Sequence, residues 1–259
     1  MSAKPLLVVA GIGNGSGTGA ATARLFAKKG YRVALVARNA DHLNRLAGEI
    51  NNEGGEAAAF PVPDYSYSAT LSVFDTISAH KWNSEGPSEL RVGVWNAGSG
   101  VRKGFLDVTE EDIVESLQVN VTAAFAFSRG AILKFKENSL DARGKRGTLI
   151  FTGATASIRG NVTTSTFAAG KFGIRALSQS LAKEFGKQNI HVAHAIIDGA
   201  ILTGQGLERR SGEEAERYKN DLDVRLDATS LANNYLNLVE QDRSAWTWEL
   251  DFRPAHEKW

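Results

Sequence analysis

The chain has 259 residues, and its 30 Lys and Arg against 29 Asp and Glu give a formal net charge of +1. This length can bury a substantial core, either as one large α/β domain or as two small ones. The balanced charge gives no electrostatic reason to expect a nucleic-acid or membrane-surface partner. The sequence contains no Cys, which excludes a disulfide framework, a thiol nucleophile and any Cys-ligated metal.

The sequence shows no pattern typical of a secreted or membrane-spanning protein. Residues 1–5 are followed by an apolar run over Leu6–Ala10 only, which is shorter than the core of a signal peptide. No uninterrupted apolar stretch reaches the length that crosses a bilayer. We therefore expect a cytoplasmic globular protein.

Apolar runs and helical patterns alternate along the whole chain. The first half predicts, in order, a strand at Leu6–Ala10, a helix at Ala20–Lys29, a strand at Tyr31–Ala37, a helix at Ala40–Glu53, a strand at Ala57–Val62 and a helix at Ala69–Ala79. The second half predicts a strand at Leu90–Trp95, one or two helices over Glu110–Lys136, a strand at Thr148–Thr152, a helix at Thr166–Gly186, a strand at Val192–Ile197 and a closing strand at Trp246–Leu250.

This alternation predicts right-handed βαβ units and a parallel sheet with helices on both faces. Continuous apolar strands are typical of such a doubly covered sheet. No Pro- or Ser-rich boundary interrupts the pattern, so we predict a single α/β domain of the Rossmann type over residues 1–259. The charge-dense segment at 203–223 is expected to be a helical excursion that covers the substrate as a lid.

The glycine-rich segment Gly11–Gly19 follows the first strand, where the pyrophosphate of a dinucleotide would bind. The spacing G-x-x-x-G-x-G fits Gly13, Gly17 and Gly19, and it also fits the set that begins at Gly11, so the register stays open. An ordinary glycine-rich turn is the alternative interpretation. The residues expected to hold the phosphates are Gly13, Gly15, Gly17, Thr18 and Gly19.

The end of the second strand bears on the choice of cofactor. A site for NAD normally places a carboxylate there to hold the ribose 2′-hydroxyl. The sequence instead has Arg38 and Asn39, and an arginine can pair with a 2′-phosphate. We therefore predict NADP(H), although no second basic residue stands in the glycine loop and Arg38 could equally cap a surface helix.

Together these residues resemble the short-chain dehydrogenase/reductase family over nearly the whole chain. The resemblance implies that Asp64 contacts the adenine and that Asn96-Ala97-Gly98 is the family's N-A-G motif. It also implies that Asn120 is the active-site Asn and Lys171 is the Lys of the Y-x-x-x-K motif. The segment after the sixth strand resembles P-G-x-x-x-T and would hold the nicotinamide end through Gly199, Ile201 and Thr203, with Asp198 in place of Pro.

The sequence departs from the family at the chemistry itself. Phe167 stands at the position of the catalytic Tyr, and Ala154 at the position of the Ser. In the family, Tyr donates a proton while Ser polarises the carbonyl group, and Lys lowers the pKa of the Tyr. Phe and Ala can do neither. The chain is similar to a divergent branch that has Phe for Tyr and keeps the Lys.

The first functional hypothesis is a reductase with altered acid chemistry. It would reduce a small-molecule acceptor that needs little proton donation, such as an iminium ion or a conjugated acceptor. Lys171 and Asn120 are retained, and the hydroxyls of Thr155 and Ser157 are candidate replacement donors, although each is also an ordinary loop hydroxyl. Arg159 lies in the same loop and could bind an anionic substrate or merely be solvated.

Two other hypotheses remain open. The chain could be a non-catalytic NADP(H)-binding protein, because Lys171 can bind ribose and Asn120 can brace a helix without any turnover. It could also be a non-redox isomerase or cyclase on the same fold. A metal site is not expected, since His191 and His194 face opposite sides of a strand.

The resemblance also implies a homo-oligomer, either a dimer or a tetramer. The helices over Glu110–Lys136 and Phe167–Gly186 would pack against those of a second subunit. Some apolar residues of these helices must face their own sheet, and the candidates for the contact surface are Phe125, Phe127, Phe172 and Leu177.

Overall fold

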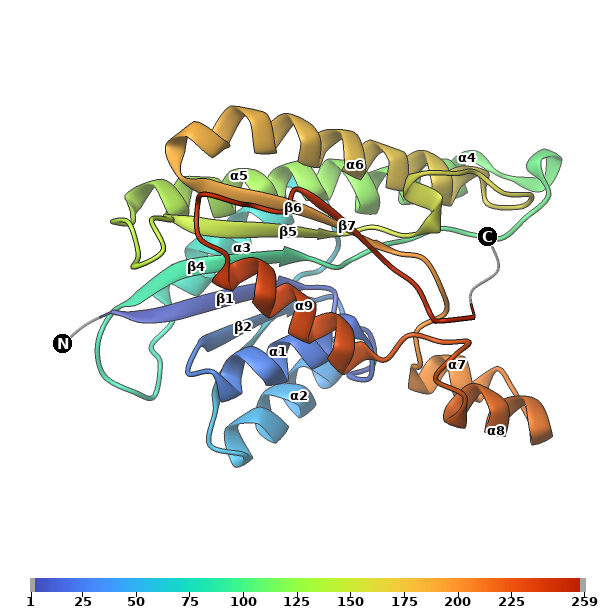
Figure 1. The fold of residues 1–259 in the computed structure, drawn as a ribbon, viewed down its shortest axis with the longest axis horizontal. Coiled ribbons are helices and arrows are strands. Elements are labelled where there is room, and N and C mark those ends of the chain that lie inside the picture. The colour runs from blue at the N-terminus through green and yellow to red at the C-terminus, as the bar shows by residue number, and fades with distance from the viewer. Residues whose placement is uncertain (1–2, 257–259) are drawn as a thin grey trace.

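A computed structural model describes residues 3–256 and shows one parallel sheet between two layers of helices (Figure 1). The strand order is β3-β2-β1-β4-β5-β6-β7, and every neighbouring pair is parallel. The order reverses between β1 and β4, as in a Rossmann fold, so the predicted fold class is confirmed. The strands are β1 Lys4–Ala10, β2 Arg32–Ala37, β3 Glu56–Pro61, β4 Ser88–Trp95, β5 Gly147–Thr152, β6 Ile190–Ile197 and β7 Glu249–Phe252.

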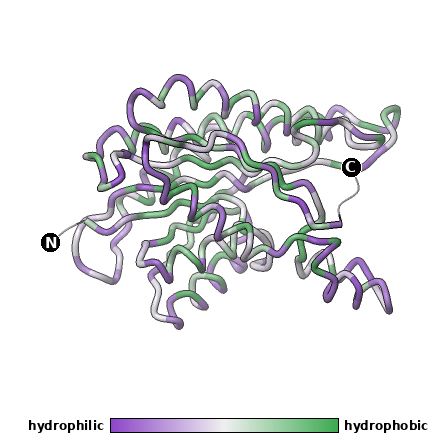
Figure 2. Tube along the Cα trace, in the orientation of Figure 1, coloured by the Kyte–Doolittle hydropathy of each residue, from purple (hydrophilic) through white to green (hydrophobic). Residues whose placement is uncertain are grey.

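Each face of the sheet is covered by its own set of helices (Figure 1). One layer consists of α1 Thr18–Lys28, α2 Ala40–Asn52 and α9 Ala228–Glu240, and the other of α3 Tyr67–Ala79, α4 Glu110–Leu117, α5 Ala123–Glu137 and α6 Ser165–Phe185. All residues of β2, β5 and β6 are buried, which explains why these strands are apolar without alternation. Figure 2 shows the same contrast, with hydrophobic strands inside and mostly hydrophilic outer helix surfaces.

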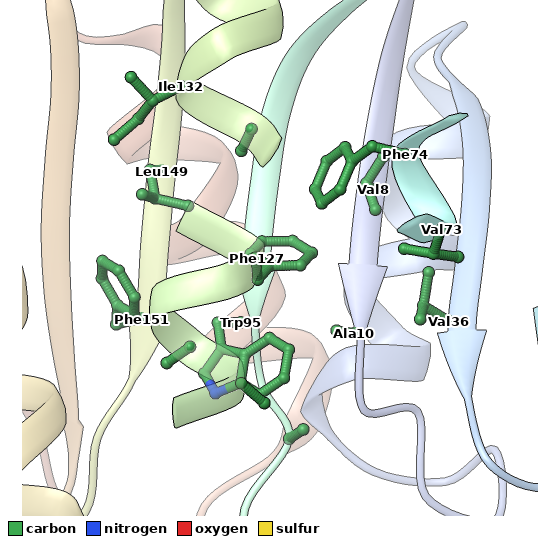
Figure 3. Close-up of a cluster of buried hydrophobic side chains, with 14 of the residues drawn as sticks. Val8, Ala10, Val36, Val73, Phe74, Trp95, Phe127, Ile132, Leu149 and Phe151 are labelled. Atoms are coloured by element: carbon green, nitrogen blue, oxygen red, sulfur yellow. The ribbon is translucent and has the colours of Figure 1, made fainter. Parts of the chain in front are cut away.

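Large aromatic side chains fill the layer between the sheet and α5 (Figure 3). The Phe127 ring centroid lies 5.2 Å from that of Trp95 and 5.3 Å from that of Phe74. Trp95 therefore anchors the end of β4 in the core, immediately before the loop that forms the site.

Two predicted elements differ from the structure in instructive ways. The region Glu110–Lys136 is one irregular helical run, in which a π-helical turn at Gln118–Thr122 joins α4 to α5. The closing strand β7 lies three residues later than the predicted start at Trp246, because register is set by pairing with β6. The predicted excursion at 203–223 contains two short helices, α7 Gly204–Glu208 and α8 Gly212–Asn220.

The parallel arrangement brings the carboxyl ends of all strands to one edge of the sheet. The loops after β1, β4, β5 and β6 meet there, together with α7 and α8 (Figure 1). In an open α/β sheet, ligands bind at this edge beside the point where the strand order reverses. No helix in the described residues is long and apolar enough to cross a membrane.

Candidate active site

The glycine-rich loop after β1 makes close backbone contacts that exclude side chains. A Cβ on Gly19 would lie 2.2 Å from the carbonyl oxygen of Gly11, and a Cβ on Gly11 would lie 2.4 Å from the backbone nitrogen of Ala97. Gly11 also has a φ of 92°, which other residues rarely adopt. The first turn of α1 is thereby held against the ends of β1 and β4.

Three basic side chains from α1 and α2 hold this loop. Arg24 donates to the carbonyl oxygen of Gly15 at 2.9 Å, and Arg45 donates to that of Asn14 at 2.5 Å. His42 Nδ1 lies 3.1 Å from the carbonyl oxygen of Gly13. None of these three residues was predicted as a site residue, because a contact between a helix side chain and a loop backbone is set by tertiary packing. The sequence does contain one indication of such a contact, because His42 and Arg45 are spaced one turn apart on α2.

Thr18 and Asn39 lie at the first turns of α1 and α2. The Thr18 side chain is buried, and its hydroxyl has no hydrogen-bond partner in the structure. Asn39 caps α2 by accepting from the backbone nitrogen of His42 at 2.9 Å. A buried hydroxyl without a partner beside a helix N-terminus is suited to a ligand anion.

Arg38 lies in the wall of a cavity of about 310 Å³ at the end of β2, which we call the Arg38 cavity. Its guanidinium lies 5.3 Å from the centroid of the Tyr65 ring, and its Nη1 is 3.8 Å from Glu115 Oε1. Burial raises the pKa of Tyr65 to about 12, so this ring stays neutral. Tyr65 is a site residue that sequence analysis missed, because nothing in its own segment marks it.

The resemblance implies that Asp64 contacts the adenine of the cofactor. In the structure Asp64 is exposed and accepts from the backbone nitrogen of Ser66 at 2.8 Å. That hydrogen bond, together with the Ser66 side chain, lowers the pKa of the Asp64 carboxyl. The described residues that line the Arg38 cavity are Gly11, Gly13, Ala37, Arg38, Asn39, Tyr65, Asn96, Ala97 and Gly98, which do not include Asp64.

The segment Asn96-Ala97-Gly98 joins the glycine loop to the catalytic region. Asn96 Nδ2 donates to the carbonyl oxygen of Gly11 at 2.6 Å. A Cβ on Gly98 would lie 3.2 Å from Lys171 Nζ and 3.3 Å from Asn120 Oδ1, so these two polar atoms lie beside the same backbone. Asn96 and Gly98 also line a second cavity of about 610 Å³, which we call the Lys171 cavity.

Lys171 is the buried cation of this second cavity. Its Nζ donates to the carbonyl oxygen of Thr152 at 2.9 Å and lies 5.7 Å from the centroid of the Phe167 ring. Burial lowers the pKa of Lys171 to about 8. Phe167 and Ala154 line the same cavity and offer no polar side-chain atom there.

Asn120 lies in the π-helical turn between α4 and α5. Its Nδ2 donates to the carbonyl oxygens of Ser116 and Ser99, at 2.8 Å and 2.5 Å. Its Oδ1 is buried and has no partner in the structure. The widened turn thus places this oxygen beside Gly98, as Lys171 Nζ is, and π-helical turns often mark functional positions.

The two candidate hydroxyls after β5 have different environments. Ser157 is fully buried, accepts from the backbone nitrogen of Ala154 at 3.1 Å and lies outside the cavity wall. Thr155 lines the cavity, but its hydroxyl donates to Asp198. Neither hydroxyl is therefore free to donate into the cavity as the structure stands.

Asp198 is the buried carboxylate beneath this part of the cavity. Its Oδ2 lies 3.3 Å from Arg159 Nη2 and 2.8 Å from Arg253 Nη1. Arg159, which the sequence marked as a possible anion-binding residue, is thus paired with Asp198. Sequence analysis noted that Asp replaces Pro here, but it missed Arg253, which lies far away in the chain beyond β7.

The segment after β6 closes over the glycine loop. Gly199 and Ile201 line the Lys171 cavity, and Thr203 caps α7 by accepting from the backbone nitrogen of Gly206 at 3.0 Å. The backbone nitrogen of Gly204 donates to Ser16 Oγ at 2.9 Å. All three residues predicted for this segment thus lie near the glycine loop or in the cavity wall.

The histidines of β6 are structural. Burial lowers the pKa of both His191 and His194 to about 4, so both rings are neutral at pH 7. His194 Nδ1 lies 2.9 Å from Glu249 Oε2, and His191 stacks on Trp246. Within residues 3–256, no group of three or more His, Cys, Asp or Glu side chains is arranged to hold a metal ion.

Comparisons with known proteins agree with this geometry. A family model described as short chain dehydrogenase matches residues 7–214. The 3-oxoacyl-[acyl-carrier-protein] reductase of Mus musculus is 30% identical over 197 residues, which cover 76% of each protein. A short-chain dehydrogenase structure from Rhodopseudomonas palustris is 30% identical, with a TM-score of 0.76 over 96% of this chain and 98% of the other.

A further solved structure, a short-chain dehydrogenase from Burkholderia cenocepacia in complex with NADP, shares the fold at 24% identity, with a TM-score of 0.79 over 96% of each chain. The chain belongs to the short-chain dehydrogenase/reductase family, a family of oxidoreductases.

Proposed function

We propose that the chain is an NADP(H)-dependent oxidoreductase that reduces an activated small-molecule acceptor, such as an iminium ion or a conjugated carbonyl compound. The composition of the Lys171 cavity carries this proposal. Among the described residues that line it, Arg102 and Lys171 are the only ones with an ionisable side chain. Because an arginine keeps its proton in proteins, Lys171 is the ionisable group there that can release one near neutral pH.

The residues present fit a dinucleotide. The Arg38 and Lys171 cavities share Asn96 and Gly98, so one extended ligand can occupy both. The glycine loop and the unpartnered Thr18 hydroxyl lie at the first turn of α1, where a pyrophosphate binds. A bound NADPH would supply the hydride. Arg38, whose side chain is 54% exposed, would pair with the 2′-phosphate.

Lys171 can take over the proton transfer that the family assigns to Tyr. An ammonium group has three N–H donors, and Thr152 uses one of them. A group with a pKa of about 8 is still mostly protonated at pH 7 and is well matched to general acid catalysis there. In this assignment Lys171 Nζ donates a proton to the enolate that forms when hydride reaches a conjugated carbonyl compound. An iminium ion becomes a neutral amine on hydride transfer and needs no proton from Lys171.

The acceptor must be activated because the cavity lacks a free polarising hydroxyl. Ala154 stands in place of Ser, and the Thr155 hydroxyl donates to Asp198 instead of the cavity. A simple ketone would therefore lack the hydrogen bond that the family's Ser hydroxyl gives to the carbonyl oxygen. An iminium ion already carries a positive charge on the group that receives the hydride. A conjugated acceptor spreads the negative charge that develops on hydride transfer over several atoms.

A spectrophotometric screen of NADPH oxidation tests this proposal. We expect turnover with a cyclic iminium ion and with an α,β-unsaturated ketone, and almost none with acetophenone. In the reverse direction, with NADP⁺ as the oxidant, simple alcohols should also give almost no turnover. Robust alcohol oxidation that survives Thr155→Ala and Ser157→Ala would contradict the proposal. NADPH binding in calorimetry without turnover of any acceptor would favour a second candidate, a non-catalytic NADP(H)-binding protein, which the absence of both Tyr and Ser also supports.

We further propose that the chain forms a cytoplasmic homo-oligomer through α4, α5 and α6. Phe125 and Phe172 are 51% and 43% exposed on these helices, as is Val114 at 57%. Phe127 and Leu177 are buried against the sheet, so they cannot contribute to the contact. Light scattering should give a mass of two or four chains, and a monomer of 27.9 kDa would contradict this proposal.

The segment 203–223 has the position that a lid requires. Gly204 ties it to the glycine loop through Ser16, and Tyr218 of α8 donates to the carbonyl oxygen of Ile201 in the cavity wall. We expect NADPH to protect this segment from limited proteolysis, and unchanged cleavage with bound cofactor would argue against a lid.

A further inference from the structure

Arg102 is one of the two cationic residues that line the Lys171 cavity. It is exposed and makes no hydrogen bond or ion pair with any described residue. The neighbouring cation behaves differently, because Lys103 Nζ lies 2.6 Å from Asp112 Oδ2. A free guanidinium in a cavity wall is a ready partner for an anionic ligand group.

The backbone on both sides of Arg102 is held in place. Gly100 packs on Phe167, since a Cβ on Gly100 would lie 2.6 Å from the Phe167 Cβ. On the other side, the backbone nitrogen of Lys103 donates to the carbonyl oxygen of Thr163 at 3.1 Å. The loop after β4 is thus pinned to α6 and to the loop before it, and Arg102 lies between the two attachment points.

The charge of the cavity wall is one-sided. Among the described residues that line it, Arg102 and Lys171 are cationic, and none is a carboxylate. The nearest buried acid, Asp198, is already paired with Arg159 and Arg253. The wall also has apolar side chains, among them Phe167, Ile197 and Ile201, beside neutral polar ones such as Asn161 and Thr164. The cavity therefore suits a molecule with an apolar body and a negative group.

The cofactor phosphates would not use this charge. They are expected at the glycine loop and at Arg38, whereas Arg102 belongs to the cavity that contains Lys171 and Phe167. Arg102 does not line the Arg38 cavity within the described residues. Its free charge is available for the acceptor.

We infer that Arg102 binds an anionic oxygen group, a carboxylate or a phosphate, on the acceptor, and that this contact selects acceptors with an apolar body and one negative group. The inference rests on the proposed function, because it places the acceptor in the Lys171 cavity. The anion-binding role that the sequence suggested for Arg159 is thereby assigned to Arg102, because Arg159 is already ion-paired with Asp198.

Three matched probes test the inference by calorimetry on the full chain saturated with NADP⁺. They are cyclohex-2-enone, its 3-carboxylate (3-oxocyclohex-1-ene-1-carboxylate) and the corresponding phosphonate. We expect at least one charged probe to bind about tenfold or more tightly than the neutral one, in the range of a charge-assisted hydrogen bond. The carboxylate and phosphonate arms distinguish the two anionic groups.

Two variants separate the local contact from the overall charge. Arg102→Gln should abolish the preference for the charged probe and leave the NADP⁺ dissociation constant unchanged, whereas Arg102→Lys should keep part of it. Arg143→Gln removes the same charge from an exposed residue before β5, at the opposite end of the strands, and should change nothing.

The outcomes separate this inference from the proposed function. Equal affinity for charged and neutral probes, a preference that survives Arg102→Gln, or no binding of either charged probe at millimolar concentration would overturn the role of Arg102. An Arg102-dependent preference without turnover of any probe would support the role of Arg102 while the reductase proposal failed. Turnover of the neutral enone without any Arg102-dependent preference would support the reductase proposal while the role of Arg102 failed.

Discussion

The Arg38 cavity and the Lys171 cavity differ in how far they keep the family pattern. At the first, the glycine loop, Asn96 and the backbone contact between Gly11 and Ala97 are all present. At the second, the resemblance implies that Lys171 is retained while Phe167 and Ala154 stand at the positions of the Tyr and the Ser, and Asn120 is not among the described residues that line this cavity. A cofactor site depends on close approach between the backbone and the ligand, which tolerates few changes of residue. A proton donor, by contrast, can be replaced by another group nearby.

Burial has opposite consequences in these two regions. Beside Arg38, burial raises the pKa of Tyr65 and keeps its ring neutral and inert. Beside Phe167, burial lowers the pKa of Lys171 toward neutrality and makes its proton more acidic. The same desolvation thus removes one group from acid chemistry and prepares the other for it.

The largest expected effect is the loss of Lys171. Lys171→Met should lower kcat for a conjugated carbonyl acceptor by about 10²–10⁴-fold, because it removes the proton donor. The matched control is Lys145→Met. Lys145 is also buried, and burial lowers its pKa to about 8, but it donates to the carbonyl oxygen of Val239 away from both cavities. Steady-state kinetics give kcat for both variants, and an equal loss of kcat in the two would contradict a catalytic role for Lys171.

The pH dependence of kcat tests the same role without a mutation. A donor with a pKa of about 8 is protonated below that pH and neutral above it. We expect kcat to be flat below about pH 8 and to fall roughly tenfold per pH unit above it. Phe167→Tyr, which adds a second donor, should move or remove this descending limb. A profile that rises through pH 8 would show that the neutral amine is the active form.

Arg38 should determine cofactor preference. Arg38→Gln should weaken NADPH binding by about 1–3 kcal/mol, the value of a charge-assisted hydrogen bond, and leave NADH binding unchanged. Glu115→Gln should act in the opposite direction by a smaller amount, because the Glu115 carboxylate, 3.8 Å from Arg38, competes with the phosphate. Dissociation constants for both cofactors measure the two effects, and tighter NADH than NADPH binding in the native chain would contradict the assignment.

A final effect concerns the free energy of unfolding and lies outside both cavities. His194 is neutral in the folded chain, since burial lowers its pKa to about 4, whereas an unfolded His titrates near 6.5. Protons therefore bind the unfolded state first, and the free energy of unfolding should fall as the pH drops from 6.5 to 4, by up to about 3 kcal/mol for this group. Urea unfolding at several pH values measures it. His194→Gln should reduce the slope of the unfolding free energy against pH. An unchanged slope would show that other groups cause the acid sensitivity.

Most of the fold could be predicted from the sequence because its signals are local. The apolar runs at Leu6–Ala10 and Thr148–Thr152 lie within β1 and β5. The start of α2 at Ala40 was also predicted, since Asn39 is a residue type that caps helices. The register of β7 was predicted less well, because a strand end depends on its partner β6.

The alternation of strands and helices, the glycine loop and Phe167 four residues before Lys171 could be predicted from the sequence, because each depends on neighbouring residues. The order of the strands in the sheet depends on tertiary packing. The tertiary structure alone decided which charges remain free. It paired Arg159 and Arg253 with Asp198, buried Ser157, and left Arg102 in the cavity wall. The physical reason is that an ion pair depends on the distance between side chains from distant segments, and only the packing of the chain sets that distance.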